Sequence, residues 1–248
     1  MKIEIAENSI IGSREEQQDA CYAYTDGARA FAVVCDGMGG TQGGADASRL
    51  TASKLKEILE AKSAAESWPA FFLRTIDILD EAVVNLQKQP EHSSCGTTVV
   101  AAVVEREQLY WMSVGDSRLY ILRANEIVQV TRDHNFALSL EQWSAQESET
   151  AATTLRNPRA DALISFIGMG GIKIYDVNQN AFQLLCGDKI LLTSDGITKL
   201  LADAEIRACL ANTTPQSGLA QLFAQATQKA KNAQDNSTCV LIQIERGI

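Results

Sequence analysis

The sequence predicts an α+β protein in which stacked, mainly antiparallel sheets are flanked by helices. Strand-like runs outnumber helical runs, and the helical runs come in consecutive pairs. The regular alternation of strand and helix that builds a doubly wound parallel sheet is missing. No repeat, low-complexity tract or linker divides the 248 residues, so we expect a single domain over residues 1–248.

Three strand-like runs open the chain. The first two cover residues 2–5 and 20–24. The third, Arg29 to Cys35, is nearly continuous in apolar character, which is typical of a strand buried on both faces. A glycine-rich turn follows it at residues 36–44.

Two helices are expected next. Apolar residues keep a helical spacing over residues 45–59, and Ser67-Trp68-Pro69 is typical of a cap followed by an early proline. The second helix has its own apolar stripe, formed by Phe72, Ile76, Leu79, Val83 and Leu86.

The middle of the chain is rich in strands. Short polar breaks separate four apolar runs, and this spacing predicts antiparallel hairpins over residues 97–104, 108–114, 117–123 and 126–130. From Asn135 to Ala162 the sequence turns polar and aperiodic, so we expect an exposed insertion that acts as a flap.

The C-terminal part is expected to return to strands, then helices, and to end in a strand. The strand-like runs cover residues 162–166, 181–185 and 189–194. Helical segments follow around residues 202–210 and 216–231, and the last strand covers 237–244.

Charge and composition restrict the partners. A net charge of -9 would repel nucleic acid and anionic membrane surfaces, so we expect neither as a partner. There is no N-terminal apolar segment and no run near the ~18–20 apolar residues that span a bilayer. The six cysteines are scattered through apolar runs, as reduced core residues are. We therefore expect a cytoplasmic monomer.

Three aspartates lie at the ends of apolar strands. Asp36 and Asp195 follow strand-like runs, and Asp235 precedes one; Asp19 and Asp116 add two more carboxylates. A single Asp-Gly or Asp-Asn pair is an ordinary turn former. Carboxylates that converge on one sheet rim repel one another, however, and are normally gathered around Mg²⁺, Mn²⁺ or Ca²⁺.

The residue after Asp36 fits such a site. Because Gly37 has no side chain, its backbone carbonyl can approach the same ion. Zinc is disfavoured, because the two histidines, His92 and His134, lie far from any cysteine-rich spacing.

The sequence lacks the motifs of other proteins that bind or transfer phosphate, in each case because one required residue is missing. Gly39 to Gly44 lacks the lysine of a P-loop, and Gln42 stands where a dinucleotide fingerprint needs glycine. No cysteine has an arginine six positions later, and Asp36 has no aspartate two residues on. Hydrolysis by metal-bound water is the chemistry that remains.

Seven short motifs in order along the chain carry a family resemblance. Together they resemble the PP2C (PPM) family of protein phosphatases in its bacterial form, from near residue 10 to the C-terminus. The motifs are Arg14 with Asp19, Asp36-Gly37-Met38-Gly39-Gly40, Ser94-Cys95-Gly96-Thr97-Thr98, Gly115-Asp116-Ser117-Arg118, Asp133-His134, Asp195-Gly196 and Asp235-Asn236-Ser237-Thr238.

The resemblance implies a fold and a metal centre. The fold is a four-layer α-β-β-α sandwich with two Mn²⁺ or Mg²⁺ ions at one end of its sheets. Asp36 would bridge the two ions, Gly37 would lend its carbonyl to one, and Asp195 and Asp235 would bind the other.

The remaining roles also come from the resemblance. Asp19 would lie behind the ligands, and Asp116 with Asp195 would hold a third, weaker ion. Arg14 would grip the substrate phosphate. Catalysis is thus assigned to Arg14, Asp36, Asp195 and Asp235.

The chain departs from the family pattern at two positions. Gln18 stands where a glutamate is usual, so a carboxylate that orders metal-bound water is replaced by an amide. Met38 stands in the place of a histidine that eukaryotic members use as a proton donor, which leaves the leaving-group acid unassigned. We expect Arg118 to be a structural ion-pair partner and His134 to fix its loop by hydrogen bonds.

These observations predict a phosphatase that acts on phosphoserine and phosphothreonine in proteins and that opposes a Ser/Thr kinase. Two alternatives stay open. One is a weakly active module that binds phosphoproteins, because Gln18 loosens the metal site; the other is a phosphatase of small metabolites.

Overall fold

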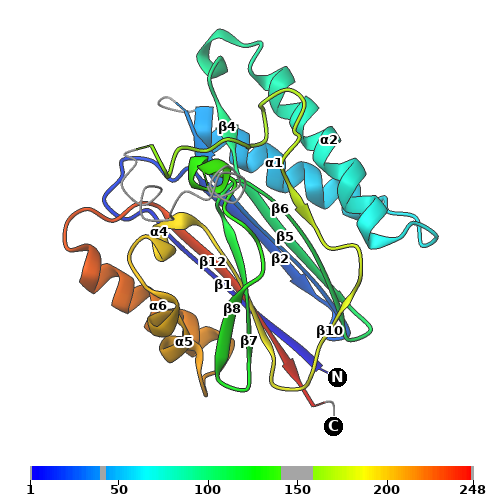
Figure 1. Cartoon of the computed structure of the whole chain (residues 1–248), viewed down its shortest axis with the longest axis vertical. Coiled ribbons are helices and arrows are strands. Elements are labelled where there is room, and N and C mark those ends of the chain that lie inside the picture. The colour runs from blue at the N-terminus through cyan, green and yellow to red at the C-terminus, as the bar shows by residue number, and fades with distance from the viewer. Residues whose placement is uncertain (1, 40–42, 141–158, 247–248) are drawn as a thin grey trace.

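The computed structural model describes residues 2–39, 43–140 and 159–246. Two antiparallel sheets lie face to face, and helices cover the outer face of each (Figure 1). Both termini lie at one end of the sandwich, as Figure 1 shows.

The first sheet contains seven strands. The strands run in the order β10 (Phe182–Gln183), β6 (Gln108–Val114), β5 (Val99–Glu105), β3 (Arg29–Met38) and β2 (Asp19–Thr25). Two short strands pair with inner strands of this sheet, β4 (Gly96–Thr97) with β3 and β9 (Asp176–Val177) with β6.

The second sheet joins the two ends of the chain. Its order is β1 (Lys2–Ile10), β12 (Ser237–Glu245), β11 (Lys189–Thr193), β7 (Arg118–Arg123) and β8 (Glu126–Gln129). The first and last strands pair along their whole length, from Lys2 opposite Glu245 to Ile10 opposite Ser237. The first strand is therefore longer than the predicted residues 2–5.

Helices form the two outer layers. On one side lie α1 (Gly43–Glu60) and α2 (Trp68–Leu86), and on the other α5 (Asp203–Leu210) and α6 (Pro215–Ala230). The Ser67 side chain caps α2 as predicted, accepting a hydrogen bond from the Ala70 N–H. Two short helices are η1 (Pro90–His92) and α4 (Asp195–Thr198). None of the helices in the described ranges is long and apolar enough to cross a bilayer.

Three apolar cores hold the four layers together. One lies between α1, α2 and the first sheet, the second between the sheets, and the third between the second sheet and α5 and α6. Strand β3 contributes to two of them, because Phe31 and Val33 face the helices while Ala32 and Val34 face the other sheet. The predicted fold class and the burial of this strand on both faces are confirmed.

The predicted strand over residues 162–166 is wrong. These residues form an irregular segment with an isolated bridge from Leu163 to Asn135, and the next residue, Ile167, forms another with Thr97. Farther on, the buried Asp80 carboxylate of α2 accepts hydrogen bonds from the N–H groups of Gly168, Gly170 and Gly171, at 2.8, 3.2 and 2.7 Å. The glycines have positive φ, so the backbone turns around the carboxylate instead of continuing as a strand.

Most of the predicted flap, residues 141–158, lies outside the described residues. Its two ends are held side by side, because Phe136 N–H donates to the Ala162 carbonyl at 2.9 Å and Ala137 N–H to the Ala160 carbonyl at 3.0 Å. His134 fixes the base of the insertion by donating its N–H to the Gly115 carbonyl at 3.0 Å.

Removing the Asp80 carboxylate should destabilise the fold. Asp80→Ala leaves three backbone N–H groups without their acceptor, and we expect the free energy of unfolding to fall by about 3 kcal/mol. Urea unfolding followed by circular dichroism measures this loss. Asp77→Ala is the matched control, because Asp77 lies on the same helix but is exposed. Equal stability of the two variants would show that the glycine turn holds without Asp80.

Candidate metal centre and active site

Two carboxylates face each other across the first sheet. Asp19 begins β2 and Asp36 lies near the end of β3, and the antiparallel register places them directly opposite one another. Like charges in this position repel. The Asp36 backbone is fixed nonetheless, because its N–H donates to Thr98 Oγ1 at 3.0 Å and its carbonyl accepts from the Thr98 N–H at 2.9 Å.

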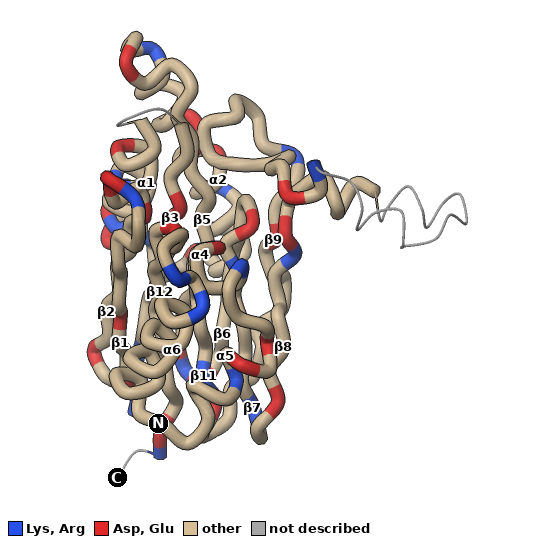
Figure 2. Tube along the Cα trace, turned by 90° about the vertical axis from the view of Figure 1, so that its left-hand side faces the viewer, with Lys and Arg blue, Asp and Glu red and all other residues tan. Residues whose placement is uncertain are grey.

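Two more carboxylates come from the second sheet. Asp195 follows β11 and begins α4, and Asp235 lies two residues before β12. Since β11 and β12 are antiparallel neighbours, the end of β11 lies beside the start of β12, and both aspartates lie at the same end of the sheet. Asp116, in the turn between β6 and β7, is the fifth. Figure 2 shows acidic segments close together where β3 and α4 meet.

Ser194 connects the two pairs. Its hydroxyl donates to Asp19 Oδ2 at 2.8 Å and accepts the Thr238 N–H at 2.9 Å. A carboxylate of the first sheet is therefore tied to the β11–β12 edge of the second. Ser194 was not among the predicted site residues, because nothing in the local pattern distinguishes a serine beside an Asp-Gly turn.

Burial and neighbouring charges raise the pKa values of three of these carboxyl groups. Burial raises the pKa of Asp36 well above its ordinary value, and Asp19, Asp195, Asp116 and Asp235 raise it further. Burial, and then the charge of Asp195, raises the pKa of Asp116 to about 6. Burial also raises the pKa of Asp19, although its hydrogen bond from Ser194 opposes the shift. The five groups therefore act as one electrostatic unit.

Two basic side chains pair with this unit among the described residues. Arg14 Nη2 lies 2.7 Å from Asp235 Oδ2. Lys199 Nζ contacts Asp195 Oδ2. Arg14 is exposed, with a 61% accessible side chain, so it can exchange one anion for another. The structure thus places the predicted carboxylates and Arg14 at one end of the two sheets, with Lys199 beside Asp195.

The donor set fits a hard divalent cation. The acidic groups offer only oxygen, which Mg²⁺ and Mn²⁺ prefer. Asp19 Oδ1 is buried without a hydrogen-bond partner. Among the described residues, no three Asp, Glu, His or Cys side chains lie close enough together to hold one ion.

Two glycines allow the backbone to pack tightly beside the aspartates. A Cβ on Gly37 would lie 2.1 Å from the Gly44 carbonyl oxygen, and one on Gly196 would lie 2.0 Å from that of Asn236. Both glycines directly follow a predicted ligand. Any larger residue would push apart the segments that carry the carboxylates.

Asn236 is a further residue whose role the sequence did not reveal. Its Oδ1 accepts the Gln18 N–H at 2.8 Å, and its Nδ2 donates to the carbonyls of Ile11 and Glu16 at 2.8 and 3.0 Å. The segment that carries Arg14 and Asp19 is thereby tied to the start of β12. Only its place in the Asp235–Thr238 motif marked it.

The residues predicted to be structural occupy such positions. Arg118 forms a bidentate pair with Asp133, at 2.9 Å from Nε and 2.6 Å from Nη2. His134 is fully buried, and its Nδ1 accepts the Gly115 N–H at 3.1 Å. Gln18 directs its amide nitrogen to Glu16 Oε2 at 3.4 Å. Its effect on metal affinity stays a prediction.

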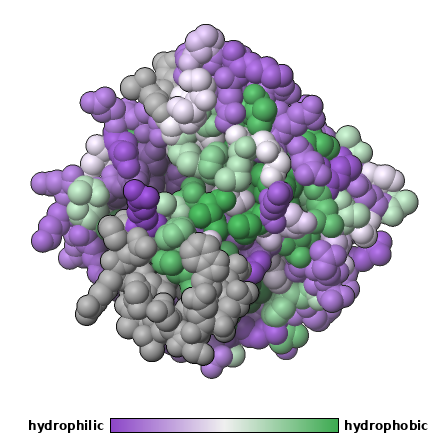
Figure 3. All heavy atoms as spheres, turned by 45° about the horizontal axis from the view of Figure 1, so that its top comes forward, coloured by the Kyte–Doolittle hydropathy of each residue, from purple (hydrophilic) through white to green (hydrophobic). Residues whose placement is uncertain are grey.

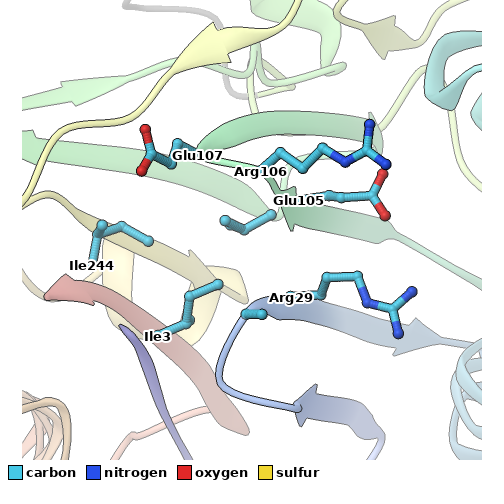
Figure 4. A pocket seen from close by; sticks show the side chains of 8 residues that line it. Ile3, Arg29, Glu105, Arg106, Glu107 and Ile244 are labelled. Carbon is cyan, nitrogen blue, oxygen red and sulfur yellow. The ribbon is translucent and has the colours of Figure 1, made fainter. Parts of the chain in front are cut away.

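A surface hollow of about 460 Å³ lies away from the carboxylates, lined by residues that include Ile3, Arg29, Glu105 and Ile244 (Figure 4). Arg29 and Asp36 are seven residues apart on β3, or about 23 Å along an extended strand. This hollow is therefore not part of the carboxylate cluster.

An arginine beside a partly buried cluster of oxygen donors, at the end of two stacked sheets, is typical of a metal-dependent enzyme that handles phosphate. Comparisons with known proteins agree. The family model described as protein phosphatase 2C matches residues 8–241. The serine/threonine phosphatase stp of Listeria innocua is 29% identical over 215 residues, which cover 85% of this chain and 83% of that protein.

Solved structures share the fold. Serine/threonine phosphatase Stp1 from Staphylococcus aureus matches with a TM-score of 0.81 at 26% identity, covering 99% of this chain and 96% of that one. The catalytic domain of PstP, solved with two manganese ions, matches with a TM-score of 0.79 at 24% identity over 99% of both chains.

The chain belongs to the protein phosphatase 2C family. The predicted family is confirmed, and so is the predicted enzyme class, a metal-dependent protein serine/threonine phosphatase.

Neutralising Asp36 should stabilise the metal-free protein. The pKa of Asp36 is raised in the fold, so the folded state binds more protons than the unfolded state, and stability falls as pH rises above the ordinary carboxyl range. In EDTA at pH 7.5, Asp36→Asn should raise the free energy of unfolding by about 1 kcal/mol or more, the scale of one pKa unit.

Thermal and urea unfolding in EDTA measure this gain. Asp77→Asn controls for the loss of one exposed carboxylate. A metal-free Asp36→Asn protein less stable than wild type would show that Asp36 is not under repulsion.

Proposed function

We propose that this chain hydrolyses phosphoserine and phosphothreonine in proteins with two Mn²⁺ or Mg²⁺ ions. Asp36, Gly37, Asp195 and Asp235 would hold the two ions, and Asp116 with Asp195 would hold a third more weakly. The observation that carries this proposal is the set of five carboxylates, contributed by both sheets and coupled through their charges. The two manganese ions of the PstP structure support it.

The ions, when bound, supply an activated water and neutralise the negative charge of the phosphate. The carboxylates hold these cations, and buried Asp19 stands behind them, with Ser194 fixing one of its oxygens at 2.8 Å. Fixed ligands keep the reacting groups in line.

Arg14 binds and orients the phosphate in this proposal. Its guanidinium is exposed and already bonded to a carboxylate oxygen, Asp235 Oδ2. A phosphate offers the same planar, bidentate pairing. Phosphate and Asp235 therefore compete for Arg14, and a cation that neutralises Asp235 frees the arginine for substrate.

Phosphoproteins are the substrates that we favour over small metabolites. Figure 3 shows the molecule with its top tilted forward, and apolar residues lie near the middle of this face with hydrophilic ones around them. Such a mixed surface suits a polypeptide that presents a phosphorylated side chain. The relative in Listeria innocua bears the name serine/threonine phosphatase.

The cellular setting belongs to the same proposal. All six cysteines are free, in keeping with a reducing compartment such as the cytoplasm. The opposing Ser/Thr kinase, the monomeric state, the single domain over residues 1–248, the flap and the lack of nucleic-acid or membrane partners stay predictions.

Activity should depend on metal. EDTA should abolish the hydrolysis of para-nitrophenyl phosphate and of phosphopeptides, and Mn²⁺ should restore both. Asp235→Ala should lower the rate by about 10³-fold, the scale of losing a principal electrostatic stabiliser. Full activity in a metal-stripped sample would contradict the proposal, and a preference for small phosphate esters over phosphopeptides would favour a metabolite phosphatase.

Arg14→Ala should weaken substrate binding without loss of metal. We expect KM for phosphopeptides to rise and kcat to fall, because a phosphate clamp acts in both the ground and transition states. Arg29→Ala is a matched control, since Arg29 is equally exposed at 61% and pairs with Asp26 in the same way. Loss of bound Mn²⁺ from the Arg14 variant would identify Arg14 as a structural residue.

A further inference from the structure

Lys199 is a basic residue built into the acidic cluster. It lies four residues after Asp195, one helical turn along α4, and its N–H donates to the Asp195 carbonyl at 2.9 Å. Its ammonium group contacts Asp195 Oδ2. Backbone and side chain together therefore hold the lysine beside a predicted metal ligand.

This contact differs from an ordinary surface ion pair. Exposed pairs on a helix are screened by water and contribute little. Here the Asp195 side chain is only 15% exposed, while the lysine side chain is 55% exposed. The ammonium group thus covers a largely buried carboxylate from the solvent side.

The charge of Lys199 reaches further than Asp195. Burial lowers the pKa of Lys199, but Asp195, and then Asp116 and Asp235, raise it above its ordinary value. The same lysine opposes the rise in the pKa of Asp116. It therefore acts on both carboxylates predicted to hold the weaker ion.

The two basic side chains of the site interact with different carboxylates. Arg14 forms an ion pair with Asp235 and is also attracted by the charges of Asp195 and Asp36. Lys199 forms an ion pair with Asp195 and is also attracted by the charge of Asp116. Arg14 is on a loop and can turn to a phosphate, whereas Lys199 is held at the end of a helical turn.

We propose that the Lys199 ammonium group is a built-in counter-ion on the Asp116–Asp195 side of the cluster, where it competes with a divalent cation. This inference rests on the proposed function. The negative charges of Asp116 and Asp195 would attract the third ion, and the Lys199 ammonium group already neutralises part of this charge. The third ion consequently binds weakly. The main ion that shares Asp195 is less affected, because Asp36 and Asp235 would hold it as well.

Counting bound ions tests the proposal without any turnover measurement. Calorimetric Mn²⁺ titration, with electron paramagnetic resonance to count bound ions, would compare wild type with Lys199→Met. We expect the variant to bind its weakest ion at least about 10-fold more tightly, the lower end of the effect of residues that support metal ligands. Lys199→Arg keeps the charge and should bind like wild type.

Two further variants locate the effect. Lys54→Met removes a lysine from another helical ion pair, the exposed Lys54–Glu57 pair on α1, and should leave Mn²⁺ binding unchanged. Adding Asp116→Asn to Lys199→Met should remove the gained affinity, since the extra ion would lose a ligand.

Several outcomes would overturn the proposal. Equal number and affinity of ions in wild type and Lys199→Met would do so, as would a gain in Lys199→Arg as large as in Lys199→Met. A Mn²⁺-soaked wild-type crystal with an ion beside Asp116 and Lys199 still on Asp195 would also contradict it. Wild type that binds no Mn²⁺ would instead refute the proposed function itself.

Discussion

Repulsion among five carboxylates is the constraint on which the site depends. Burial and neighbouring charges raise the pKa of Asp36 together with those of Asp19 and Asp116. A flexible chain would let these groups separate into water. They stay together because the strands that carry them are anchored in three apolar cores, so the free energy of packing offsets the electrostatic cost.

Close backbone packing complements this anchoring. Gly37 approaches the first turn of α1, and Gly196 approaches the segment before β12. Ser194 then spans the two sheets with hydrogen bonds to Asp19 and to the backbone of Thr238. The metal site is therefore a property of the contact between the sheets rather than of either sheet alone.

The acidic character of the chain makes local positive charge decisive. A protein with a net charge of -9 repels a phosphorylated substrate at a distance. Arg14 and Lys199 reduce the negative charge at the site itself, because Arg14 pairs with Asp235 and Lys199 pairs with Asp195. Bound divalent ions would reverse its sign locally, so metal loading and phosphate binding support each other.

The sequence alone determined the layers and the ligand candidates. A continuous apolar run predicted β3, and a capping serine with an apolar stripe predicted α2. Both signals are local, because buried strands and helix starts each favour particular residues at fixed positions. Aspartates at strand ends, followed by glycine, marked Asp36 and Asp195 in the same way. These features need no knowledge of distant neighbours.

Tertiary structure alone decided what those residues contact. The run at 162–166 looks like a strand, yet Asp80, more than eighty residues earlier, accepts the N–H groups of the glycine turn that follows it. The contact of Lys199 with Asp195 is local, but its reach to Asp116 depends on the meeting of segments far apart in the chain. The physical reason is that hydrogen bonds and charges act through space, whereas sequence patterns record only the preferences of neighbouring residues.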